Sequence, residues 1–130
     1  MTESFWAIPD TKNLRTPVTI LKEQAEALTR ATNGVLEGSV ETFPANQPNF
    51  GWRLRSCLTI NVPFLKDYAV NILTYSHNIT MYPGILNGDY ENGFSTVENE
   101  EEFVSRIKEI LSSRTTMTIL ANLISQAEAA

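Results

Sequence analysis

The two residues best suited to covalent chemistry are Cys57 and His77, the only cysteine and the only histidine in the chain. A thiol beside an imidazole can act as a nucleophile and its base, provided that a third group orients the imidazole. A single cysteine in a strand is more often a small packing residue, and a single histidine near a strand end is more often a surface or hydrogen-bonding group. The sequence therefore favours a protein without catalytic residues, and an enzyme is the weaker alternative.

Metal-binding and phosphate-binding patterns are missing from the sequence. A zinc site needs three or four Cys, His or carboxylate ligands, and this chain offers one cysteine and one histidine without paired spacing. The Asp- and Asn-containing segment 87–93 lacks the alternating ligands and the terminal glutamate of an EF-hand loop. No glycine-rich phosphate loop or dinucleotide fingerprint occurs. We therefore expect neither a metal nor a cofactor.

The segment 75–84, YSHNITMYPG, combines His77, an Asn-Ile-Thr glycosylation motif and a Tyr-Pro-Gly turn signal. The glycosylation motif has meaning only in a secreted chain. The first twenty residues lack the basic start and the apolar run of a secretory signal, and a single cysteine agrees with a reducing compartment. We therefore expect a cytoplasmic protein, in which this segment forms the corner of a sheet.

Composition indicates a folded protein of one domain. The chain has 130 residues, of which 42% are hydrophobic and 19% charged. This length is sufficient for a single core spanning residues 1–130. No window approaches eighteen consecutive apolar residues, so we expect no membrane span.

The formal charge of -5 is concentrated in residues 87–109, where seven carboxylates face only Arg106 and Lys108. Such a field repels phosphate backbones, so nucleic acid is not an expected partner. A basic protein would be attracted to the same region. The alternative is an ordinary solvated helix start that keeps the protein soluble. The carboxylates are Asp89, Glu91, Glu98, Glu100, Glu101, Glu102 and Glu109.

A first helix is predicted between Thr16 and Gly34. Thr16 is a suitable N-cap, Pro17 suits the first helical position, and Asn33-Gly34 is typical of a left-handed helix end. An apolar stripe at three- and four-residue spacing lies between these ends. It consists of Val18, Leu21, Ala25 and Leu28, with Ile20, Gln24 and Ala27 at its margin.

Two further helices are predicted over residues 99–111 and 115–130. Asn99 is a suitable N-cap, and Glu102 is placed to close a capping box. The apolar positions are Phe103, Val104, Ile107, Ile110 and Leu111 in the first of these helices, and Met117, Leu120, Leu123 and Ile124 in the second.

Between the helices the apolar period changes to two, which is typical of strands. Gly38 weakens the first strand and suggests a bulge, while Pro83 places the last strand at the sheet edge or breaks it. Unpaired backbone groups at such an edge could accept a strand from a partner. The expected strands are 35–43, 50–64, 68–77 and 79–86, and two Asn-Gly steps mark 87–94 as a turn or loop.

These elements predict an α+β fold with an N-terminal helix, an antiparallel sheet of three to four strands and two C-terminal helices. The helices should gather on one face of the sheet. Residues 1–15 form an N-terminal arm that contains Phe5, Trp6 and Ile8 ahead of any regular element. We expect the arm to dock on the body of the domain, because these side chains would otherwise lie in water.

A candidate binding surface follows from strict strand alternation. Trp52, Leu54, Leu58, Ile60, Val70 and Ile72 would face the helices. The uncovered face would then carry Asn71 and five candidate binding residues, namely Arg53, Arg55, Leu73, Tyr75 and His77. Aromatic and Arg side chains are enriched in protein interfaces. We expect this face to bind a protein partner or a second copy as a homodimer; the alternative is an ordinary solvated sheet face.

The function that these observations favour is that of a small, acidic, non-catalytic protein-binding module. An inhibitor, an immunity or antitoxin-like protein for a basic effector, or a secretion chaperone would suit the size and charge. One alternative is a small-molecule binder or enzyme with a pocket between sheet and helices near His77, Tyr75 or Tyr82. A second is a structural subunit of a homo-oligomer that pairs its open sheet faces.

Overall fold

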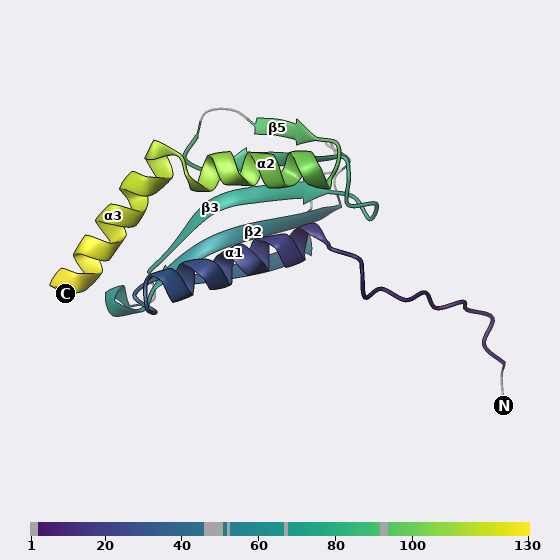
Figure 1. Cartoon of the computed structure of the whole chain (residues 1–130), viewed down its shortest axis with the longest axis horizontal. Helices are drawn as coiled ribbons and strands as arrows, with labels where there is room; N and C mark the ends of the chain where they lie inside the picture. Colours follow the sequence, from purple (N-terminus) through teal and green to yellow (C-terminus); the bar gives the residue numbers. More distant parts are fainter. Residues whose placement is uncertain (1–2, 46–50, 52, 67, 92–93) are drawn as a thin grey trace.

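A computed structural model describes residues 3–45, 51, 53–66, 68–91 and 94–130. In these residues three α-helices accompany a five-stranded antiparallel sheet of order β1-β2-β3-β4-β5 (Figure 1). The α+β class and the antiparallel sheet are confirmed, and the sheet has more strands than predicted. The elements are α1 (Pro17–Ala31), β1 (Glu37–Pro44), β2 (Leu54–Val62), the short 3₁₀ helix η1 (Pro63–Leu65), β3 (Tyr68–His77), β4 (Gly84–Gly88), β5 (Phe94–Val97), α2 (Glu100–Leu111) and α3 (Arg114–Ala129).

The first helix begins and ends as its sequence predicts. The Thr16 hydroxyl accepts a hydrogen bond from the Thr19 N–H at 3.1 Å, and Pro17 opens the helix. After the helix, Asn33 and Gly34 have φ angles of 51° and 81°. These local signals therefore fix the extent of α1.

The face that α1 buries is rotated slightly from the predicted stripe. Ile20, expected at its margin, is buried with Leu21 and Ala25, whereas Val18 is half-buried. Gly38 lies beneath this face in regular pairing with Ile60, so the predicted bulge is wrong. A Cβ at Gly38 would lie 2.6 Å from the Ala25 Cα, so glycine here permits close packing of α1 on β1.

A β-bulge in β3 changes which residues face the helices. Leu58 pairs with Leu73, but the next residue, Thr59, pairs with Asn71, so Ile72 is an extra residue on β3. Ile72 and Leu73 are consecutive and both are buried, with exposed fractions of 3% and 0%. Beyond the bulge the side-chain alternation is therefore shifted by one residue relative to the prediction.

The fourth strand does not lie at the edge of the sheet. β4 lies between β3 and β5, and it begins at Gly84, after the cis peptide bond between Tyr82 and Pro83. Residues 79–80 form a turn, in which the Met81 N–H donates to the Asn78 carbonyl at 2.9 Å. Of the two alternatives predicted for 79–86, the edge position is wrong, and the break at Pro83 is confirmed, because the strand begins only at Gly84. The edge strand at this side is β5, which shares only Phe94 with the predicted loop 87–94 and otherwise lies where no strand was predicted.

The start of α2 is capped from both directions. Asn99 accepts a hydrogen bond from the Glu102 N–H at 2.9 Å, as its sequence predicts. The Glu102 carboxylate accepts at 2.7 Å from the Glu98 N–H, one residue before the N-cap. The Glu102 carboxylate thus bonds to the residue before the N-cap instead of to the N-cap itself, and this contact joins α2 to the end of β5.

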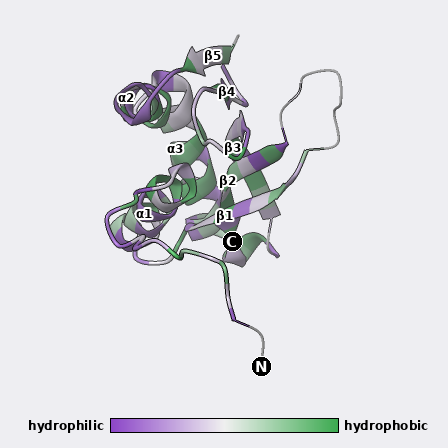
Figure 2. Ribbon diagram, turned by 90° about the vertical axis from the view of Figure 1, so that its right-hand side faces the viewer, coloured by the Kyte–Doolittle hydropathy of each residue, from purple (hydrophilic) through white to green (hydrophobic). Residues whose placement is uncertain are grey.

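Helices α1 and α2 lie on the same side of the sheet, as Figure 2 shows, whereas α3 extends beyond the end of α2 (Figure 1). Leu123 and Ala127 are the apolar anchors of α3, with exposed fractions of 6% and 5%. Met117, predicted on the apolar face, is 61% exposed. One face of the sheet thus holds the core, and α3 contributes only to its end.

The N-terminal arm, residues 3–15, does not dock on the body of the domain. It extends away from α1 (Figure 1), and Phe5, Trp6 and Ile8 are 92%, 83% and 83% exposed. The expected docking is therefore not found. The arm is rich in apolar side chains, but no described residue of the same chain covers those three.

Candidate binding surface

The five residues predicted to share an uncovered face lie on different sides of the sheet. Leu73, Tyr75 and His77 are 0%, 0% and 4% exposed, and they point to the side that the helices cover. Arg53 is exposed and Arg55 is half-buried. The bulge at β3 is the physical cause, because it moves the three β3 residues to the core face. The predicted five-residue patch therefore does not form.

Tyr75 is the centre of a buried aromatic cluster. Its ring centroid lies 5.1 Å from that of His77 and 4.6 Å from that of Phe103 on α2. Its hydroxyl donates to the Met81 carbonyl at 2.7 Å. Burial raises the pKa of Tyr75, and burial with the nearby Glu100 carboxylate raises the pKa of Tyr82 to about 12. Tyr75 thus packs the core instead of presenting a contact surface.

His77 has one hydrogen-bonded ring nitrogen and one without a partner. Its Nδ1 lies 2.7 Å from the Asn78 carbonyl oxygen, a geometry in which Nδ1 carries the proton and donates. Nε2 is buried and has no hydrogen-bond partner among the described residues. Since His77 pairs with Leu54, three residues from Cys57, the thiol and the imidazole lie on opposite faces of the sheet. They therefore do not form a nucleophile and base.

Cys57 packs on the uncovered side. It pairs with Thr74, with its Sγ 3.6 Å from the Thr74 Oγ1, and it is 8% exposed. In the part of the chain that the structure describes, no three His, Cys, Asp or Glu side chains gather as a cation site would need. The same residues include no helix that is long and apolar enough to cross a membrane.

The uncovered sheet face is mainly polar, and several of its side chains hydrogen-bond to one another, whereas the buried Arg55 Nε has no hydrogen-bond partner among the described residues. The Thr59 hydroxyl donates to the Asn71 amide oxygen at 2.8 Å, and the Asn61 amide donates to the Ser39 hydroxyl at 2.9 Å. Arg55 lies in this face between Phe43 and Ser76 on the neighbouring strands. The arrangement is typical of a solvated sheet face.

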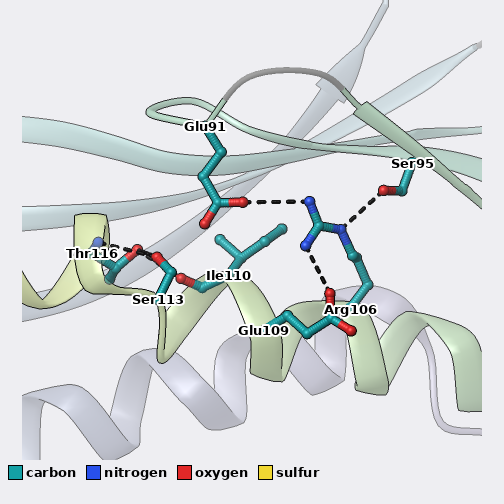
Figure 3. Close-up of polar contacts among 7 residues, drawn as sticks. All are labelled: Glu91, Ser95, Arg106, Glu109, Ile110, Ser113 and Thr116. Atoms are coloured by element: carbon teal, nitrogen blue, oxygen red, sulfur yellow. Dashed lines mark hydrogen bonds and ion pairs between the residues drawn. The ribbon is translucent and has the colours of Figure 1, made fainter.

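An acidic groove of about 530 Å³ lies between β5 and α2. Arg106 of α2 connects the two sides of the groove, as Figure 3 shows, because its Nε donates to the hydroxyl of Ser95 on β5 at 2.9 Å. The other guanidinium nitrogens approach Glu109 at 3.0 Å and Glu91 at 3.4 Å. Three of the residues lining the groove are Glu101, Glu102 and Glu109. The contact by which Arg106 joins α2 to β5 was not predicted from the sequence.

The N-terminal arm is the largest group of exposed apolar side chains on one segment. Leu14, at 61% exposure, extends the series begun by Phe5, Trp6 and Ile8. The arm joins the body at Arg15, which forms a 2.6 Å ion pair with Glu23 of α1. The apolar residues of the arm are evident in the sequence, but the sequence does not indicate which surface would cover their side chains.

Comparison with known proteins identifies no relative. No family model matches the chain, and neither a curated protein nor a solved structure matches it. Its function therefore has to be inferred from its own geometry.

Proposed function

We propose that this protein is a small, non-catalytic protein-binding module and that its N-terminal arm is the binding element. The observation that carries the proposal is the exposure of Phe5, Trp6 and Ile8, at 92%, 83% and 83%. Exposed apolar side chains are ordinary when scattered singly, but a group of them is typical of an interaction site. Tryptophan in particular is enriched among the residues that dominate binding energy.

Covering the arm contributes a substantial part of the free energy of association. Burial of one large apolar side chain contributes roughly 1.5–3 kcal/mol, so three contribute roughly 4.5–9 kcal/mol. Immobilising them costs about 0.5–1.5 kcal/mol each, and association costs about 4–15 kcal/mol in lost translational and rotational freedom, so the three side chains act together with the contacts around them. The arm is already extended and exposed, so a partner need not unfold any element to reach it.

The absence of catalysis is supported by the separation of Cys57 from His77. Since these two side chains lie on opposite faces of the sheet, the most reactive pair in the sequence is not assembled. A pocket near His77 would instead favour the alternative of a small-molecule binder. The Tyr75 ring stacks on the imidazole, with its centroid 5.1 Å away, and Phe103 packs on Tyr75, which argues against that alternative.

A second candidate contact is the acidic groove between β5 and α2. β5 is an edge strand, and Glu101, Glu102 and Glu109 line the adjacent groove. An extended basic segment could pair with the edge and place its cations beside the carboxylates. This feature favours a basic protein as the partner. Such a partner suits a cytoplasmic inhibitor, an immunity or antitoxin-like protein, or a secretion chaperone.

The test is a comparison of binding with and without the apolar side chains of the arm. The triple variant F5S/W6S/I8S removes them, and Ile79→Ser is a matched control, because Ile79 is 84% exposed on a turn of the body. Tagged proteins would be recovered from cells that produce the chain, and bound proteins would be identified by mass spectrometry and then reconstituted from purified components.

The proposal predicts that the wild type and Ile79→Ser retain the same purified partner, whereas the triple variant loses at least about tenfold in affinity, equivalent to 1.4 kcal/mol. Circular dichroism should show all three proteins equally folded. Equal affinity of the triple variant for every reconstituted partner would contradict the proposal.

A further inference from the structure

A groove formed by three depressions that share lining residues follows α1 on the helix-covered side of the sheet, with α2 opposite its outer end and α3 and the sheet at its inner end. At its outer end two depressions, of about 440 and 470 Å³, share Arg15 and Lys108. The larger of these shares Gln24 and Leu111 with an inner depression of about 250 Å³. The inner end is lined mainly by apolar side chains, among them Leu28, Leu58, Ile60, Ile72 and Leu120.

We infer that this groove receives the N-terminal arm of a second copy of the chain, which receives the first copy's arm in return. This inference rests on the proposed function, and it names the partner. The supporting observation is that the arm joins the body at Arg15, which is one of the residues that line the outer end of the groove. An exposed apolar segment and an unoccupied apolar groove thus meet at one point of the fold.

The length of the arm fits an exchange between two copies. From Pro17 to Leu28, α1 extends about 17 Å at 1.5 Å per residue, which gives the approximate length of the groove. Residues 3–8 span about 20 Å when extended, at roughly 3.3 Å per residue, so they match this length. Residues 9–14 then remain to bridge the two copies, which places Phe5, Trp6 and Ile8 within the groove.

The path of the arm favours a second copy over the arm's own groove. The Leu14 N–H donates to the Thr11 carbonyl at 3.1 Å, and Arg15 is held to Glu23 at 2.6 Å. From Arg15 the arm extends away from α1 and α2 (Figure 1). A return into its own groove would need a reversal of the chain at these tied residues. Exchange between two copies needs no reversal, and two-fold symmetry makes both contacts equivalent.

The area is sufficient for a stable dimer. Large aromatic side chains bury about 150–250 Å² each, so Phe5 and Trp6 on each of two arms bury roughly 600–1,000 Å², to which the two Ile8 side chains add. The groove surfaces that they cover add to this area, and specific interfaces bury about 1,200–2,000 Å² in total.

The experiment is a cross-link between two different copies. In a Cys57→Ser background, Ser4→Cys marks the part of the arm expected at the inner end of the groove and Leu28→Cys marks that end, each in a separate chain of different tag length. The two purified chains are mixed and oxidised. We expect a disulfide between the S4C chain and the L28C chain. Ile79→Cys mixed with L28C is the matched control, and it should give less than about a tenth of that yield.

Light scattering provides the second measurement. The wild type should have twice the 14.6 kDa mass of one chain, and F5S/W6S/I8S should have the mass of one chain. A monomeric wild type, or a dimer that persists in the triple variant, would overturn the inference. So would a double variant S4C/L28C that forms its disulfide within one chain, because the arm would then cover its own groove.

These outcomes are distinguishable from failure of the proposed function. If the wild type is monomeric but the arm still binds a different purified protein, the inference falls and the proposed function stands. If neither a second copy nor another protein depends on the arm, both fall.

Discussion

The hydroxyl of Tyr75 donates a hydrogen bond to the Met81 carbonyl at 2.7 Å, and this contact joins β3 to the segment that leads into β4. The ring lies so close to Gly84 that a Cβ there would overlap the Tyr75 hydroxyl. Met81 has a φ of 73°, an uncommon value for a residue with a side chain. A residue predicted to contact a partner thus holds the corner of the sheet in place.

Tyr75→Phe should lower the free energy of unfolding by about 1–2 kcal/mol, because the Met81 carbonyl loses a buried donor. Urea unfolding followed by circular dichroism measures this change. Tyr82→Phe is the matched control, since the buried Tyr82 hydroxyl has no hydrogen-bond partner among the described residues. The control should change the free energy by less than about 0.5 kcal/mol. A larger effect of Tyr82→Phe than of Tyr75→Phe would contradict the assigned role.

Alkaline pH should destabilise the protein through the same cluster. The folded state raises the pKa of Tyr82 from 10.0 to about 12, chiefly by burial, and burial also raises the pKa of Tyr75. Between pH 10 and 12 the unfolded chain therefore loses protons that the folded chain retains. The free energy of unfolding consequently falls as the pH rises through this range.

The Tyr82→Phe variant separates this effect from general alkaline denaturation. Its free energy of unfolding should fall less steeply between pH 10 and 12 than that of the wild type, as measured by urea unfolding at several pH values. An unchanged slope would show that Tyr82 does not retain its proton in the folded state.

Arg106 should contribute more to stability than Arg15, although both form ion pairs. The Arg106 side chain is 23% exposed and bonds to Ser95, Glu109 and Glu91, whereas the Arg15 and Glu23 side chains are 45% and 48% exposed. Arg106→Gln should cost about 1.5–3 kcal/mol, because a half-buried charge network loses its centre. Arg15→Gln should leave the free energy of unfolding unchanged within error, as is common for solvated pairs.

Amide hydrogen exchange locates the effect of Arg106. Arg106→Gln should accelerate exchange in residues 94–97, since the guanidinium joins α2 to β5 through Ser95. Unchanged protection of β5, together with wild-type stability, would rule out this role.

Local signals explain the parts of the fold that the sequence predicted. Thr16 and Asn99 each accept a hydrogen bond from the first turn of a helix, so the start of that helix depends on neighbouring residues alone. The sheet faces depend instead on the pairing of distant strands. The extra residue Ile72 is visible only once Thr59 pairs with Asn71, and it moves Tyr75 and His77 to the core.

The candidate site was harder to predict for the same reason. The apolar residues of the arm are evident in the sequence, but whether Trp6 is covered depends on the path of the chain before α1. The edge strand β5 has four residues, which is too short for a clear period of two. Its position follows from pairing with β4 and from the contact between Ser95 and Arg106.

The most direct test of the arm as a binding element is the accessibility of Trp6 to a quencher. Trp6 and Trp52 are the two tryptophans of the chain, so Trp52→Phe leaves Trp6 as the single reporter. Acrylamide quenching would be measured for this variant when it is dilute and when it is saturated with its partner, whether a second copy or another protein. Our account predicts at least about a twofold fall in the quenching constant on binding, because Trp6 passes from 83% exposure to a covered position. An equal quenching constant in the free and the bound protein would contradict it.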